Sequence, residues 1–200
     1  MKSKLIIIPG AKALSSKNKY IQRTISFVYK YFFNFIPKYN IRNPWIDVFP
    51  KSKYEVIELK WSGKIIPYDV LKTSRKLQEL LDSNLNTKYI FLTESIGTEI
   101  ALLAIEKSKA KNVKKIIAIC PVNKPRNIKD FSIISLKSKN DIFARFSKKL
   151  LWPLHFFKFT NGNVEELSLK NIRHDQFVPN HKIEKNQTLL ELVENKIDSL

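Results

Sequence analysis

Residues 89–105 read YIFLTESIGTEIALLAI and combine two patterns of hydrophobic residues. Its first four residues are aromatic or aliphatic, which is typical of a buried strand, and its last eight favour a buried helix. A short turn lies between them, with Ser95 at its centre and Gly97 two residues later. This order predicts a strand, a tight turn and a helix, with the serine hydroxyl raised away from the sheet at the turn.

Short apolar runs of the same kind recur along the chain and alternate with helical stretches, a pattern typical of β-α-β units. We predict strands at Leu5–Ile8, Tyr54–Leu59, Tyr89–Leu92, Ile116–Cys120, Phe131–Leu136 and Val164–Leu169. We predict helices at about Val70–Asp82, Thr98–Lys109 and Gln187–Ile197. The pattern therefore predicts the α/β fold class, as a three-layer α/β/α sandwich around a mostly parallel sheet of about six strands.

The length and composition favour one globular domain, which we expect to cover residues 1–200. Hydrophobic residues make up 44% of the chain, which is enough for a sizeable core. The one cysteine, Cys120, can form no internal disulfide, so we expect a reducing, cytoplasmic setting. The apolar run at Leu5–Ile8 is too short for a signal peptide, and no run approaches the roughly 20 residues of a membrane-spanning helix.

The formal net charge of +18 raises nucleic acid or an anionic membrane as a partner. The charge comes from 30 Lys and only 6 Arg, spread over the whole length, which favours a solvated surface over a dedicated nucleic-acid site. Two stretches, 20–33 and 148–157, combine basic and aromatic residues. Each stretch has three possible roles: peripheral contact with an anionic membrane, a wall of a site for an apolar substrate, or simple packing on the sheet.

The strand, turn and helix of residues 89–105 resemble the nucleophile elbow of small esterase-like and lipase-like members of the α/β-hydrolase superfamily. The family pattern is Gly-x-Ser-x-Gly. This chain keeps Ser95 and Gly97 and has Thr93 at the first glycine position. The alternative interpretation is a serine that caps a helix, a position that Thr98 suits equally. The resemblance implies that Ser95 is the catalytic nucleophile.

The order of the remaining motifs favours the hydrolase interpretation, because the triad of this family runs serine, acid, histidine along the chain. Asp141 follows the strand Phe131–Leu136, in a segment similar to the family's Gly-x-x-Asp with Ser138 at the glycine position. His174 follows the strand Val164–Leu169, where the family has its histidine loop. The resemblance implies Asp141 as the acid and His174 as the base; a surface turn and a structural histidine are the alternatives.

The resemblance also implies an oxyanion hole made of two backbone N–H groups. One belongs to Ile96, directly after the nucleophile, and the other to Ala11 in the loop after the first strand, where Pro9 replaces the family's usual histidine. Residues 54–63 resemble the second core strand of the family, so the likeness covers most of residues 4–197, with no match in 12–53 and no large cap domain. We expect the sheet order second, first, third, fourth, fifth, sixth, with right-handed crossovers.

Three functions remain open at this point. The first is a serine esterase that needs no cofactor or metal and acts on a small-molecule ester. The second is a catalytically silent binding protein on the same scaffold, because a fold does not guarantee activity. The third is nucleic-acid or anionic-membrane binding through the lysines. Substrate choice would depend on residues 12–53 and 143–163, whose fold the sequence does not reveal, and neither the acyl and alcohol groups nor the oligomeric state can be read from it.

Overall fold

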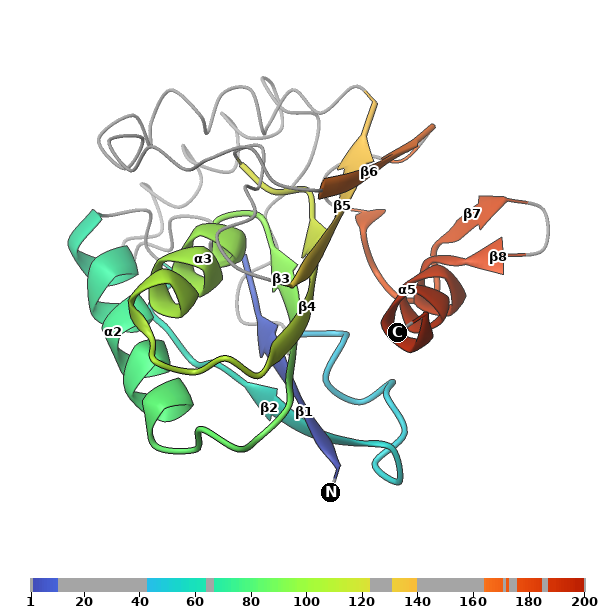
Figure 1. The fold of residues 1–200 in the computed structure, drawn as a ribbon. Coiled ribbons are helices and arrows are strands. Elements are labelled where there is room, and N and C mark those ends of the chain that lie inside the picture. Colours follow the sequence, from blue (N-terminus) through green and yellow to red (C-terminus); the bar gives the residue numbers. More distant parts are fainter. Residues whose placement is uncertain are drawn as a thin grey trace.

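The computed structural model describes residues 2–10, 43–63, 67–122, 131–139, 164–170, 172, 176–184 and 187–199. Six strands form the central sheet: β1 (Ser3–Ile8), β2 (Tyr54–Glu58), β3 (Tyr89–Glu94), β4 (Val113–Ile119), β5 (Ser132–Ser138) and β6 (Val164–Leu169). Their order is β2-β1-β3-β4-β5-β6, and each neighbouring pair is parallel (Figure 1). The predicted strands, their order and their parallel pairing are confirmed.

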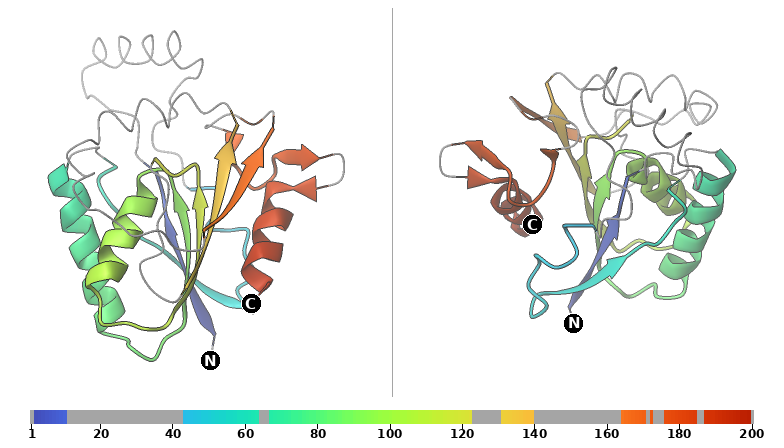
Figure 2. Two further views of the ribbon diagram at one scale, coloured as in Figure 1. Left: turned by 45° about the horizontal axis from the view of Figure 1, so that its top comes forward. Right: turned by 180° about the vertical axis from the view of Figure 1, so that it is seen from behind.

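Helices cover both faces of this sheet. Helices α2 (Pro67–Asp82) and α3 (Gly97–Lys107) lie on one face, and α5 (Leu189–Asp198) lies on the other, as Figure 2 shows. The three-layer α/β/α arrangement is therefore confirmed. None of the helices in the described part of the chain is long and apolar enough to cross a bilayer.

The first strand shows why the sequence produces two cores. Leu5 and Ile7 point to the face of α5, whereas Ile6 and Ile8 point to the face of α2 and α3, since side chains alternate along a strand. All four side chains are fully buried, and each such burial stabilises the fold by about 1.5–3 kcal/mol. A continuous apolar run is thus what a strand covered on both sides requires.

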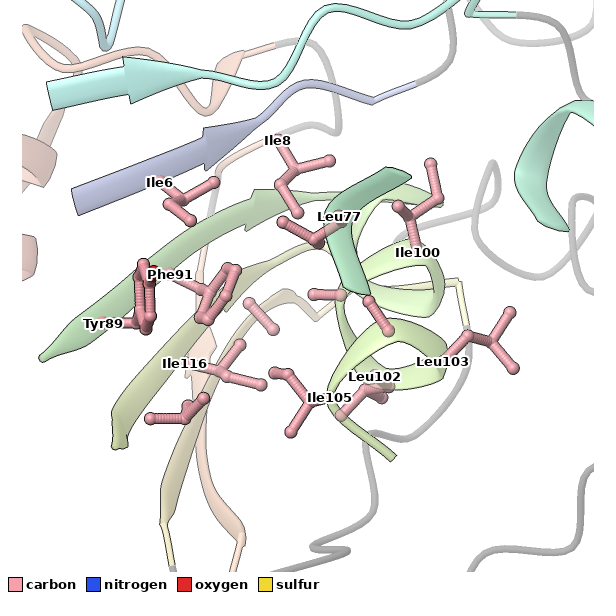
Figure 3. Packing of buried hydrophobic residues seen from close by; sticks show 14 of the residues in the cluster. Ile6, Ile8, Leu77, Tyr89, Phe91, Ile100, Leu102, Leu103, Ile105 and Ile116 are labelled. Atoms are coloured by element: carbon pink, nitrogen blue, oxygen red, sulfur yellow. The ribbon is translucent and has the colours of Figure 1, made fainter. Parts of the chain in front are cut away.

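The larger core lies between the sheet and helix α3. Figure 3 shows Ile8, Phe91 and Ile116 of three neighbouring strands beside Ile100 and Ile105 of α3. Helix α3 packs back against the sheet although it begins only three residues after β3 ends, so the connection between them must be a sharp turn. That turn is the segment that contains Ser95.

Most element boundaries differ from the predicted ones by one to three residues, and two of these differences are informative. Strand β4 begins at Val113, which pairs with Tyr89, and so includes the buried Lys115. The burial of this lysine is possible because its Nζ donates to the carbonyl of Lys196 and to Ser199 at the end of α5. Helix α5 begins at Leu189 because Thr188 caps it: Glu191 N donates to the Thr188 hydroxyl, and Thr188 N donates to the Glu191 carboxylate, which completes the capping box. The sequence analysis missed the antiparallel hairpin before this helix, formed by β7 (Lys182–Glu184) and β8 (Gln187–Thr188).

Candidate active site at the carboxyl edge of the sheet

Ser95 occupies a strained turn between β3 and α3. Its backbone φ is 50°, a region that residues other than glycine seldom adopt and keep only where the surroundings impose it. Two backbone bonds impose it here: Ser95 N donates to Ile119 O at 2.8 Å, and Thr98 N donates to Ser95 O at 3.2 Å. The serine is therefore held between the end of β4 and the first turn of α3, as the predicted elbow requires.

Gly97 is the small residue that lets helix and strand approach at this elbow. A Cβ at position 97 would lie 2.5 Å from the carbonyl oxygen of Ile8 and 3.1 Å from that of Pro9. Both obstacles are backbone atoms, which cannot rotate away as a flexible side chain can. Glycine is thus sterically required at this position, and a helix cap alone would not require it.

Thr93 stands where the family pattern has its first glycine, and the structure accommodates it. Its side chain is fully buried, and its hydroxyl lies 2.9 Å from the hydroxyl of Thr98 and 3.4 Å from Ile117 O. A buried hydroxyl with two partners avoids the penalty of an unsatisfied polar group. The departure from the pattern is therefore compatible with the elbow.

Ile96 supplies the N–H group implied as an oxyanion donor. It precedes helix α3 with φ −63° and ψ −20°, so its N–H belongs to the group of donors at the start of a helix. Among the described residues this N–H has no acceptor. The positive end of the α3 dipole also lies here, which favours negative charge beside Ser95. The second implied donor, Ala11, lies outside the described residues.

Asp141 and His174 also lie outside the described residues, but the strands that precede them are described. Strands β3, β5 and β6 are parallel, so the segments that follow them leave the sheet at the same edge as Ser95. Asp141 comes three residues after the end of β5 and His174 five after the end of β6. Ile172 and Phe177, which come before and after His174 in the sequence, have buried side chains in the core between the sheet and α5, called the α5 core below.

A polar network beside Ser95 was missed by the sequence analysis. The carboxylate of Glu94 accepts from Gly10 N at 3.4 Å and from Asn43 Nδ2 at 3.3 Å. Asn43 Oδ1 in turn accepts from Trp45 N at 2.9 Å, and Trp45 Nε1 donates to Phe177 O at 3.3 Å. A charged residue at the end of an otherwise apolar strand was the available signal, but its partners are distant in sequence.

In the described part of the chain, one further candidate for binding lies away from Ser95. A cavity of about 510 Å³ opens near the amino ends of β4, β5 and β6, where Lys115, Ser132 and Val164 line it. Burial lowers the pKa of Lys115, but its Nζ is occupied by the end of α5. Within the described ranges, no three His, Cys, Asp or Glu side chains are grouped as metal ligands.

Solved structures share this fold. No family model matches the sequence, and no curated protein matches it. An α/β hydrolase from a Mar Chica lagoon sediment metagenome aligns with TM-score 0.55 and 13% identity, covering 98% of this chain and 91% of its own. Dienelactone hydrolase from Anabaena variabilis gives 0.52 and 10%, covering 98% and 84%. An uncharacterized Bacillus cereus protein gives 0.53 and 16%, covering 98% of this chain, which spans only 59% of that protein.

The class defined by this topology is the α/β-hydrolase fold, with which the sheet order, the three layers and the elbow agree. The resemblance is thereby confirmed for the fold. Sequence identities of 10–16% show that the fold is shared but do not show that the reaction is shared.

Proposed function

We propose that the chain is a serine hydrolase that cleaves carboxylic esters, with Ser95 as nucleophile, His174 as base and Asp141 as acid. The observation that carries the proposal is the positive φ of Ser95 on a turn that tolerates only glycine at position 97. Strain of this kind is concentrated at functional sites, and an elbow presents the hydroxyl to a substrate.

The proposed reaction begins when His174 takes the proton from Ser95 Oγ and the oxygen attacks the ester carbonyl carbon. The N–H groups of Ile96 and Ala11 donate hydrogen bonds to the carbonyl oxygen and stabilise its negative charge. Collapse of this intermediate breaks the bond to the alcohol, which leaves with the proton from His174. Water, deprotonated by the same imidazole, then attacks the acyl-enzyme and releases the acid. Asp141 orients the imidazole and stabilises its charged form.

The proposed substrate is a small-molecule ester, and no specific nucleic-acid partner is part of the proposal. A cytoplasmic setting belongs to the same proposal, with the one cysteine, Cys120, buried in the α5 core. Contact with an anionic membrane through the basic and aromatic stretches stays a separate question, which salt-dependent liposome binding tests.

The test compares wild type with Ser95→Ala and with Ser83→Ala, a control at an exposed serine after α2. We expect a fluorophosphonate probe to label wild type and Ser83→Ala but not Ser95→Ala. Hydrolysis of a short-chain p-nitrophenyl ester should fall on the order of 10⁶-fold in Ser95→Ala, toward the background from the 30 lysines. Equal labelling and hydrolysis in all three proteins would instead favour a silent binding scaffold.

A further inference from the structure

The polar network beside Ser95 joins three of the segments that the proposed reaction needs: the nucleophile, the oxyanion loop and the histidine segment. Glu94 directly precedes the nucleophile, Gly10 directly precedes the proposed donor Ala11, and Phe177 comes three residues after His174. A single carboxylate oxygen, Oε2 of Glu94, accepts from both Gly10 N and Asn43 Nδ2. The network thus starts beside the nucleophile and reaches both the oxyanion loop and the histidine segment.

Asn43 and Trp45 carry the connection across to the histidine segment. Asn43 is 7% exposed and uses both ends of its amide, since Nδ2 donates to Glu94 and Oδ1 accepts from Trp45 N. Trp45 is fully buried, and its indole N–H donates to the carbonyl of Phe177, itself 5% exposed. Because these groups are shielded from water, the bonds between them hold the segments in register more firmly than exposed bonds would.

We propose that Glu94, Asn43 and Trp45 are positioning residues, which hold the oxyanion loop and the histidine segment at a fixed distance from Ser95. The inference rests on the proposed function. None of the three touches substrate in it; each acts through the segment that it fixes. Small displacements of reacting groups, on the order of 1 Å, can slow a reaction about 100-fold, so such a bridge would affect the rate directly.

The alternative is that Trp45 only fills the core, where it stacks on Phe49 with ring centroids 6.2 Å apart. Trp45→Phe separates the two roles, because it keeps an aromatic ring in the core and removes the indole N–H. Tyr54→Phe is the matched control: Tyr54 belongs to the same core, and it loses one hydrogen bond, to Asp198, away from the network.

We expect Trp45→Phe to lower kcat for a p-nitrophenyl ester by about 10- to 100-fold, with KM changed less than about threefold. Tyr54→Phe should keep the kcat of wild type. At Glu94, Glu94→Ala should lose activity to a similar degree, and Glu94→Gln should recover part of it, because its amide oxygen can still accept from Gly10 N and Asn43 Nδ2, but without the carboxylate charge. Wild-type kcat in both Trp45→Phe and Glu94→Ala would overturn the proposal.

A second measurement does not depend on activity. The chain has three histidines, so the ring proton signals in an NMR spectrum can be assigned with single His→Gln variants. We expect the His174 signal to shift or broaden in Trp45→Phe and to stay unchanged in Tyr54→Phe. An unchanged His174 signal in Trp45→Phe overturns the positioning role. Failure of the fluorophosphonate probe to label wild type contradicts the proposed function alone.

Discussion

The hydroxyl oxygens of Thr93 and Thr98 lie 2.9 Å apart, and this pair spans the elbow from the last part of β3 to the first turn of α3. Thr93 also lies 3.4 Å from Ile117 O of the neighbouring strand. If Thr93 donates to that carbonyl, its oxygen is available to accept from Thr98. The side chain that breaks the family pattern therefore ties strand, helix and neighbouring strand together.

Restoring the family's glycine should consequently weaken this protein. Thr93→Gly leaves the buried hydroxyl of Thr98 without its partner and places glycine inside a strand, so we expect a loss of about 2 to 4 kcal/mol in the free energy of unfolding. Thr93→Ser keeps the hydroxyl and should lose only about 1 kcal/mol. Urea denaturation of both variants measures the difference, and a Thr93→Gly protein as stable as wild type would contradict the assigned bond.

The two glycines around Ser95 should respond differently to alanine. At Gly97 the new methyl carbon would lie 2.5 Å from the carbonyl oxygen of Ile8. We therefore expect Gly97→Ala to lower the free energy of unfolding by about 1 to 3 kcal/mol and to slow the labelling of Ser95 by the fluorophosphonate probe. At Gly10 the methyl would lie 3.3 Å from Ser95 Cβ, so Gly10→Ala should change stability by less than about 1 kcal/mol. Thermal unfolding of the two variants checks this order, which equal losses would contradict.

The strands could be predicted from the sequence because the sheet is covered on both faces, which makes each strand an apolar run. Their order then followed from the resemblance. Polar residues with distant partners could not be predicted in this way: Lys115 can be buried within β4 because its ammonium donates to the end of α5, 81 positions later. Likewise, Glu94 finds Gly10 and Asn43 at 84 and 51 positions away, a separation that periodicity cannot reveal. Ser95 and Gly97 were recognisable because their turn is local.

Tyr54 should make the fold sensitive to alkali. Burial, and then its hydrogen bond to Asp198, raises the pKa of Tyr54 from 10.0 to about 12. Between these values the folded protein keeps a proton that the unfolded chain releases, so this group's contribution to stability falls as the pH rises from 10 to 12. Tyr54→Phe should be less stable than wild type by about 1 kcal/mol at pH 7, where the bond to Asp198 is lost.

The difference between the two proteins should therefore shrink from pH 10 to 12, as measured by urea denaturation at each pH. Lys115 contributes a slope of the opposite sign, since its pKa lies below the ordinary 10.5, but it is present in both proteins and largely cancels. A difference that stays constant to pH 12 would show that the tyrosine ionises alike in the folded and unfolded states.

The identity of the acid offers the sharpest test of the proposed triad, because three aspartates lie near the relevant segments of the sequence: Asp130, Asp141 and Asp175. Only Asp141 follows a core strand at the position of the family's acid. Asp141→Asn removes the charge that orients and stabilises the imidazolium, so we expect kcat to fall by about 10⁴-fold, less than on loss of the nucleophile.

Asp130→Asn and Asp175→Asn, which change the net charge equally, are the controls and should keep the wild-type rate. Steady-state hydrolysis of a p-nitrophenyl ester, with folding checked by circular dichroism, measures all three. A large loss in Asp175→Asn and none in Asp141→Asn would move the role of the acid to the residue beside His174.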